Sequence, residues 1–314
     1  MNKTNWARMC LALLLLIFSF NVSAQKTFKN PILPGFHPDP SICRVENDYY
    51  MVTSSFEWFP GLPIFHSKDL VNWEQIGHVL DRPSQLQMKD GLKASNGLWA
   101  PTIRYHQGTY YVICTATGCG GNFFVTADSP EGPYSEPIFI KDAPGIDPSL
   151  FFDEDGTMWY CGSINGDNKI PPRRYPAEDR IYVQQLDPST GQFIGERHIV
   201  SSGYAINSPY AEAPHIYKIK GKYYLMIAEG GTWENHAVSV FTADNIVGPY
   251  TPFICNPVLT HRHLGNDIDI TTIGHADLVQ TQNGDWYSVM LGVRPVNGFN
   301  MLGRETFLTP VEFQ

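Results

Sequence analysis

The sequence predicts an all-β protein, a five-bladed β-propeller, and three observations lead to this prediction. One short motif recurs five times at intervals of roughly 45 to 65 residues, which is the period of a propeller blade. Each copy contains a strand pattern rich in aromatic and β-branched residues, and a hairpin-type turn precedes that strand. No long segment shows clean helical periodicity free of Gly and Pro.

The five copies share one order of parts: a start, a short apolar stretch, a polar turn and a strand. In chain order the starts are Asp39-Pro40-Ser41, Ala100-Pro101-Thr102, Asp147-Pro148-Ser149, Ala213-Pro214-His215 and His275-Ala276-Asp277. The turns are Asn47-Asp48, Gln107-Gly108, Asp155-Gly156, Lys220-Gly221 and Asn283-Gly284. The strand patterns cover residues 49–52, 110–113, 158–160, 223–226 and 286–289. Each copy is therefore expected to form part of one blade.

Three of the five copies carry a carboxylate at or beside the start. Asp39 and Asp147 are the first residues of copies one and three, and Glu212 immediately precedes copy four. Equivalent positions of a propeller converge on its central axis, so we expect these three acids to meet there. Because both Asp residues precede proline, a turn-capping role is the alternative. The expected convergence is the main indication of function.

The first 24 residues are expected to form a secretory signal peptide outside the fold. Lys3 and Arg8 precede a continuous apolar stretch at 11–20, and small residues at 22–24 precede a cleavage point before Gln25. Since no cysteine follows that point, a lipoprotein anchor is not indicated. We expect a secreted or periplasmic protein without a membrane anchor, in which residues 25–314 form the propeller domain.

Composition limits the classes of partner. The formal net charge is −9 and no basic stripe is present, which argues against nucleic acid or an anionic membrane surface. Aromatic residues make up 13% of the chain, which suits the stacking of flat, weakly charged ligands, although large β proteins also use them structurally. The five cysteines after the leader are odd in number and irregularly spaced, so no disulfide framework is expected.

Several segments resemble glycoside hydrolase family 43. The three that look like its active-site motifs are PGFHPDPS at 34–41, GIDPS at 145–149 and AEAP at 211–214. Residues 56–73 and the GVRP segment at 292–295 are similar to the exo-acting β-xylosidase and α-L-arabinofuranosidase branch. The resemblance covers residues 25–314 nearly end to end. It implies a five-bladed propeller that releases terminal xylose or arabinofuranose, with inversion, from plant cell-wall oligosaccharides or polysaccharides.

The resemblance also implies a role for each acid. Asp39 would be the general base that activates water, and Glu212 the general acid that protonates the leaving oxygen. Asp147 would lie near Glu212, where its like charge would raise the pKa of Glu212 and help to orient it. In an inverting glycosidase the acid and the base stand about 6.5–9.5 Å apart, which leaves room for the water.

Four further residues are implied to bind the substrate. Arg294 would donate hydrogen bonds to sugar hydroxyls, with a surface or ion-pair role as the alternative. Phe56 and Trp99 would form apolar walls of a sugar pocket, with core packing as the alternative. His275, at the fifth start, would face the central channel. There it would contact a largely hydrated structural calcium ion, or it would be a hydrogen-bonded structural histidine. No cofactor is required for the expected chemistry.

Other functions remain open from the sequence. A non-catalytic carbohydrate-binding propeller would share the motifs but would not turn over a substrate. An endo-arabinanase would need an open groove, against which residues 56–73 argue. Members of this branch commonly continue into a C-terminal β-sandwich, whereas this sequence stops at 308–314, so it is a natural short form or a fragment. The sequence does not choose between xylose and arabinofuranose, and it does not indicate an oligomeric state.

Overall fold

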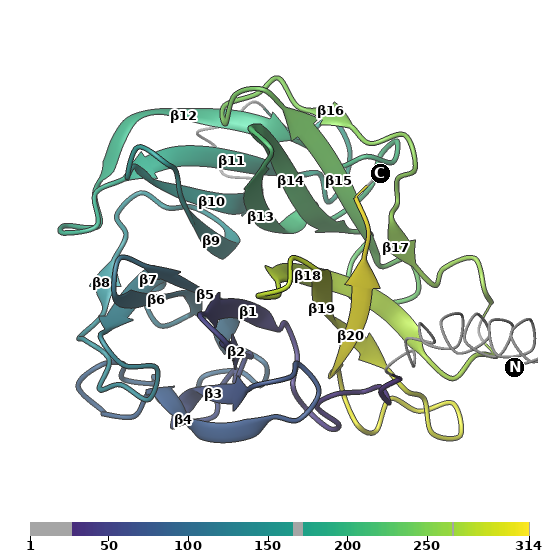
Figure 1. The fold of residues 1–314 in the computed structure, drawn as a ribbon, viewed down its shortest axis with the longest axis horizontal. Coiled ribbons are helices and arrows are strands. Elements are labelled where there is room, and N and C mark those ends of the chain that lie inside the picture. Colours follow the sequence, from purple (N-terminus) through teal and green to yellow (C-terminus); the bar gives the residue numbers. More distant parts are fainter. Residues whose placement is uncertain (1–26, 166–171, 266, 314) are drawn as a thin grey trace, which may run out of the picture.

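The structure is a computed structural model, and it describes residues 27–165, 172–265 and 267–313. The regular elements of these residues are β-strands, arranged as five sheets around a centre (Figure 1). The predicted all-β, five-bladed propeller is thereby confirmed. No helix in the described ranges is long and apolar enough to cross a membrane. The expected signal peptide at 1–24 lies outside the described residues.

Each sheet is one blade, and the strands of each blade follow one another along the chain. The first blade contains β1 (Ser41–Val45), β2 (Asp48–Val52), β3 (Gly61–Ser67) and β4 (Glu74–Leu80). The second contains β5 (Gly97–His106), β6 (Thr109–Thr117), β7 (Gly121–Ala127) and β8 (Ile138–Phe139). The third contains β9 (Ile146–Phe152), β10 (Met158–Asn165), β11 (Asp179–Leu186) and β12 (Phe193–Ser201).

The last two blades depart from this four-strand pattern. The fourth contains β13 (Glu212–Ile219), β14 (Lys222–Glu229), β15 (Ala237–Ala243), β16 (Thr251–Pro252) and β17 (Leu259–Thr260). Both β16 and β17 pair with β15. The fifth contains β18 (Thr271–Gln280), β19 (Trp286–Val293) and β20 (Glu305–Val311).

The recurring motif of the sequence forms the first hairpin of each blade. The predicted strands fall on β2, β6, β10, β14 and β19, and the starts lead into the strand before each of these. Two hairpins show why the turns have their sequences. Gln107 and Gly108 have φ of 48° and 90°, and Lys220 and Gly221 have φ of 51° and 78°. Positive φ at both central residues is the two-residue turn that matches the twist of the strands.

All five starts share an unusual backbone conformation. Their first residues lie in the left-handed region, with φ of 55° at Asp39, 43° at Ala100, 53° at Asp147, 49° at Ala213 and 48° at His275. In blades two to five the pairing with the next strand shifts register at this point. A non-glycine residue in this conformation costs about 1–2 kcal/mol. The same bend therefore turns the chain at the inner end of every blade.

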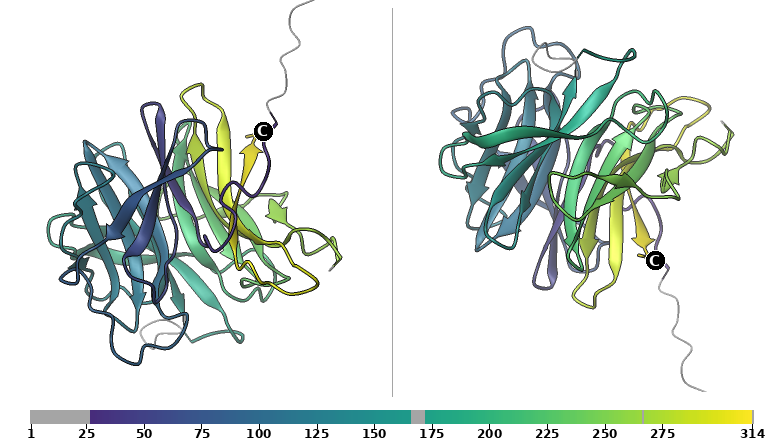
Figure 2. Two further views of the ribbon diagram at one scale, coloured as in Figure 1. Left: turned by 90° about the horizontal axis from the view of Figure 1, so that it is seen from below. Right: turned by 90° about the horizontal axis from the view of Figure 1, so that it is seen from above.

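The core lies between the blades, and the ring is closed by the beginning of the described chain. Five apolar clusters are found, one at each junction between neighbouring blades. Leu33 forms a bridge with Thr306 of β20, and the Asn30 side chain bonds both the N–H and the carbonyl of Leu308 at 2.9 and 2.8 Å. Figure 2 shows this segment running beside the fifth blade. Segment 30–33 thus joins the last blade to the first.

Cysteines do not contribute crosslinks to this core. The five that lie in the described residues are free, and only Cys255 among them is exposed. The four buried ones pack as small apolar side chains, as their irregular spacing predicts.

Candidate active site

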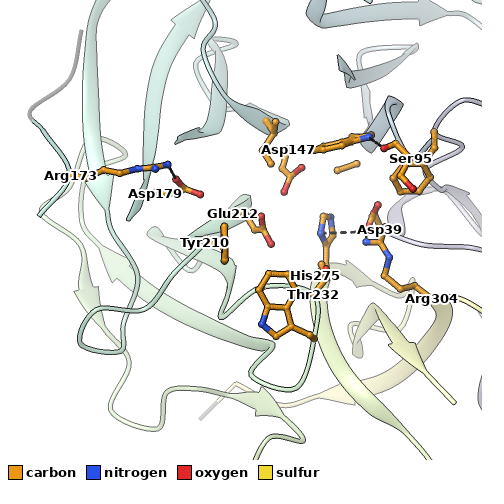
Figure 3. A pocket seen from close by; sticks show the side chains of 16 residues that line it. Asp39, Ser95, Asp147, Arg173, Asp179, Tyr210, Glu212, Thr232, His275 and Arg304 are labelled. Atoms are coloured by element: carbon orange, nitrogen blue, oxygen red, sulfur yellow. Dashed lines mark hydrogen bonds and ion pairs between the residues drawn. The ribbon is translucent and has the colours of Figure 1, made fainter. Parts of the chain in front are cut away.

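A pocket of about 440 Å³ opens where the five motif starts come together. All five blades contribute to its wall, through Asp39, Trp99, Asp147, Glu212 and His275 (Figure 3). Each start lies in, or just before, the first strand of its blade, and the left-handed residue there bends that strand beside the pocket. The structure therefore places the three predicted acids, which are far apart in the sequence, in one pocket.

Asp39 is buried and held by two donors. Arg304 Nη1 donates to its Oδ1 at 2.6 Å, and Ser54 Oγ donates to its Oδ2 at 2.6 Å. Nδ1 of His275 lies 3.8 Å from Oδ1. Burial raises the pKa of Asp39, but Arg304, His275 and the Ser54 hydrogen bond outweigh this, and the pKa is lowered overall. Asp39 is therefore an anion at neutral pH, as a general base must be.

Glu212 has the opposite electrostatic environment. It is the first residue of β13 and is buried. Burial raises its pKa well above the ordinary value, and the charges of Asp147, Asp179 and Asp39 raise it further. These effects favour the protonated form of Glu212, which is the state that a general acid needs.

Asp147 lies beside the chain that carries Glu212. Its Oδ2 accepts a hydrogen bond of 3.2 Å from the backbone N–H of Ala213, the residue next to Glu212. Burial raises the pKa of Asp147, the His275 ring opposes this, and the charge of Asp39 adds to it. The charge of Asp147 in turn raises the pKa of Glu212, so the position of Asp147 favours the protonated form of the neighbouring acid.

Aromatic side chains line part of the pocket. Phe56 and Trp99 have ring centroids 6.4 Å apart, and both line it. The Arg304 guanidinium lies over the Phe56 ring at 5.4 Å, and the Trp99 indole N–H donates to the carbonyl of Ser95 at 2.7 Å. Trp233 also lines the pocket and is 46% exposed, but the sequence analysis does not identify it.

Arg294 does not line the pocket, in contrast to the role that the resemblance implies for it. Its guanidinium forms a two-point ion pair with the buried Glu305, with Nε–Oε2 at 2.6 Å and Nη2–Oε1 at 2.8 Å. Arg304 lines the pocket instead. Arg304 and Glu305 are neighbours, but Arg304 lines the pocket whereas the side chain of Glu305 is fully buried. Glu305 points into the protein, where it needs a cation, and Arg294 supplies it.

His275 lies in the pocket wall, but its surroundings do not fit a directly ligated calcium ion. The described ranges contain no group of three or more His, Cys, Asp or Glu residues that could hold a metal. Calcium prefers several oxygen ligands, whereas the ring of His275 offers nitrogen. The nearby carboxylate of Asp39 already accepts hydrogen bonds from Arg304 and Ser54.

A second group of polar residues, which the sequence analysis leaves without a role, ties the blades together. Asp277 is buried, and its carboxylate accepts from Ser41 Oγ at 2.6 Å, from Tyr217 OH at 2.6 Å and from both Nη atoms of Arg104 at 2.8 and 3.0 Å. Burial raises the pKa of Asp277, but Arg104 and the other donors lower it far below its usual range. Asp277 thus connects four blades through the strands that carry the pocket residues.

One ion pair in the pocket wall also escapes sequence reasoning. Arg173 Nη2 donates to Oδ1 of Asp179 at 2.9 Å, and both residues line the pocket. Neither belongs to a motif start. The run of arginines and acids at 173–180 is visible in the sequence, but such a run is usually a solvated surface.

Comparison with known proteins agrees with this geometry. The sequence model of glycosyl hydrolases family 43 matches residues 28–314. A xylosidase/arabinosidase of Butyrivibrio fibrisolvens is 48% identical over 284 residues, which cover 90% of this chain and 54% of that protein. A non-reducing end alpha-L-arabinofuranosidase of Bacteroides ovatus is 47% identical over 309 residues, which cover 96% of this chain and 55% of that protein.

Solved structures show the same similarity. The GH43B protein of a Bacteroides ovatus xyloglucan locus superposes with a TM-score of 0.83 at 46% identity, covering 92% of this chain and 55% of that one. A xylan beta-1,4-xylosidase from Bacillus halodurans superposes with a TM-score of 0.84 at 40% identity, with the same coverage. The chain therefore spans about half the length of these two curated relatives and of these two solved structures.

Proposed function

The chain belongs to glycosyl hydrolase family 43, and from this membership we propose that it is an inverting exo-glycosidase. It releases terminal xylose or arabinofuranose from plant cell-wall oligosaccharides or polysaccharides. One observation carries the proposal: a single pocket holds an anionic acid, Asp39, and a protonated acid, Glu212, supplied by different blades. Similar proteins bear the names xylosidase/arabinosidase and alpha-L-arabinofuranosidase, which supports the substrate class.

The proposed reaction uses the two acids in one step. Asp39 accepts a proton from a water molecule as its oxygen attacks the anomeric carbon. Glu212 donates its proton to the glycosidic oxygen as the bond from that oxygen to the anomeric carbon breaks. The products are a sugar of inverted configuration and a shortened alcohol. Asp39 then returns its proton to solvent, and Glu212 recovers one.

The remaining pocket residues suit the binding of a small neutral sugar. Arg304 Nη1 donates to Asp39. The other N–H groups of its planar guanidinium can donate to two neighbouring hydroxyls of a sugar. Phe56 and Trp99 provide apolar surface for the carbon face of the ring. Asp147 acts on Glu212, whose pKa it raises.

Turnover of aryl glycosides tests the proposal. The p-nitrophenyl β-D-xyloside, α-L-arabinofuranoside, β-D-glucoside and β-D-galactoside are incubated with the protein and with its Asp39→Ala variant. Release of nitrophenol from one or both pentosides, lost in the variant, is the expected result. If the folded wild type binds xylo- or arabino-oligosaccharides but releases no nitrophenol, the chain is a non-catalytic carbohydrate-binding propeller.

Export of the protein is also part of the proposal, and the composition of residues 1–24 supports it. The mass of the mature protein from its native host tests it, since cleavage before Gln25 gives a defined new N-terminus. A mature protein that keeps residues 1–24 contradicts it.

A further inference from the structure

The wall of the pocket next to Glu212 contains a fourth carboxylate, Asp179. It is the first residue of β11, is 3% exposed and lines the pocket. In the view of Figure 3 it lies between Arg173 and Glu212. A buried carboxylate that faces a catalytic acid is costly unless it has a partner or a purpose.

Arg173 holds Asp179 from the far side. Its Nη2 donates to Asp179 Oδ1 at 2.9 Å, while its Nε donates to the carbonyl of Glu178 at 2.9 Å. Two different nitrogen atoms of the Arg173 guanidinium thus bond to consecutive residues, which fixes the plane of the guanidinium group. Burial raises the pKa of Asp179, and the hydrogen bond and charge of Arg173 offset only part of that rise, so the pKa stays above its ordinary value.

The segment that carries this pair is anchored on several sides. The buried Glu178 forms ion pairs with two other arginines, with Arg174 at 2.6 Å and with Arg180 at 3.1 Å. The backbone N–H of Tyr210 donates to the carbonyl of Ala177 at 3.0 Å, which ties the segment to the chain just before Glu212. Asp179 therefore has a set position relative to the acid.

We propose that Asp179 is a positioning residue for the reaction: held by Arg173, its carboxylate lies beside Glu212 on the pocket wall and acts through Glu212 rather than through the substrate. The role assigned to Glu212 rests on the function proposed above. The effect of Asp179 on the proton of Glu212 does not depend on that function.

The charges around Glu212 come from four elements. Asp147 of β9, Asp179 of β11 and Asp39 before β1 each favour the protonated form, whereas Arg304 before β20 favours the anion. Asp147 shares its environment with Glu212, and burial raises the pKa of both. Asp179 differs because it has its own counter-ion, and the hydrogen bond and charge of Arg173 favour its anionic form. After each turnover, this charge favours the return of a proton to Glu212.

The test removes the charge of Asp179 and measures the protonation of Glu212 directly by NMR. The full chain is labelled with ¹³C at glutamate side-chain carboxyls, and the Glu212 signal is assigned with Glu212→Gln. Its titration is then recorded in the wild type and in Asp179→Asn, with circular dichroism to check folding. Because asparagine leaves Arg173 without its anion, the double variant Arg173→Gln/Asp179→Asn is measured as well.

Asp153→Asn is the matched control. Asp153 belongs to the same blade, is 10% exposed and pairs with Lys218 at 2.8 Å, but it lies beyond the opposite end of β9 from Asp147. The pKa of Glu212 should be lower in both Asp179 variants than in the wild type, and it should be unchanged in the control. The alkaline limb of kcat/KM should move in the same direction.

The two proposals fail in distinguishable ways. If the wild type turns over no glycoside, the proposed function fails, while the ¹³C titration still tests Asp179. If the wild type is active but the Glu212 titration and the alkaline limb are unchanged in folded Asp179→Asn, the role of Asp179 is overturned. A fall in activity without any movement of the pH profile would also overturn it, because a purely structural residue would give that result.

Discussion

Arg304 Nη1 donates a 2.6 Å hydrogen bond to Asp39 Oδ1, which joins the residue before the last strand, β20, to the first motif start. The contact connects two residues separated by 265 positions and exists only because the propeller closes. Arg304 is among the groups that keep the pKa of Asp39 low against the effect of burial. It therefore holds the proposed base in its anionic form, in the same pocket in which burial and nearby charges raise the pKa of Glu212.

The stereochemistry of the product follows from the pairing of base and acid. Because water is expected to attack directly, the first sugar released should have the opposite anomeric configuration to the substrate. Proton NMR in the first minutes, before mutarotation, measures this. Net retention would mean that a carboxylate attacks the sugar, and the role of Asp39 as a base would be abandoned.

The roles of Asp39 and Glu212 can be separated by the leaving group. Asp39→Ala should lower kcat/KM by at least about a hundredfold on every substrate, because the proposed reaction needs Asp39 to accept a proton from the attacking water. Glu212→Ala should be equally severe on xylobiose but milder on an aryl glycoside, whose phenolate leaves without a proton. Steady-state kinetics on both substrates checks this. The opposite pattern of leaving-group dependence would exchange the two assignments.

The pH profile should respond to the charge of Asp147. The negative charge of Asp147 raises the pKa of Glu212, so Asp147→Asn should lower that pKa. Glu212 must be protonated to act, and the alkaline limb of the kcat/KM profile should therefore move to lower pH. The profile is measured on a natural disaccharide, on which the acid is needed. An alkaline limb that stays in place, or moves upward, in the folded variant contradicts this coupling.

Arg304 and Arg294 should have different mutant phenotypes. Arg304→Ala should lower kcat/KM by about tenfold to a hundredfold through loss of a charged hydrogen bond. It should also move the acidic limb upward, because Arg304 lowers the pKa of Asp39. Arg294→Ala should instead lower the free energy of unfolding by about 1–3 kcal/mol, since it leaves the buried Glu305 without its cation and with only the Gly35 N–H as donor.

Urea unfolding and pH-dependent kinetics of both variants check this difference. The matched lysine variants, Arg304→Lys and Arg294→Lys, keep the charge and should recover part of each loss. A larger loss of activity in Arg294→Ala than in Arg304→Ala, at equal stability, would return the pocket role to Arg294.

Much of the fold could be predicted because it depends on local patterns. The two-residue turn at Gln107-Gly108 and the strand after it follow from turn chemistry and from side-chain type over a few residues. Five copies of one hairpin can bury their apolar faces only against one another. The repetition of this local pattern therefore predicts the propeller architecture. The same repetition indicated that Asp39, Asp147 and His275 occupy equivalent positions.

The tertiary structure decided which arginine serves the pocket and how the acids are charged. Arg294 and Arg304 are ten residues apart in the sequence, and their environments differ because Arg294 pairs with the buried Glu305 whereas Arg304 lies in the pocket wall. Asp179 acquires its relation to Glu212 only when β11 is placed beside β13. Local sequence determines turns and strands because these depend on neighbours along the chain. Protonation depends on burial and on charges brought close by folding, so it was decided only in the closed ring.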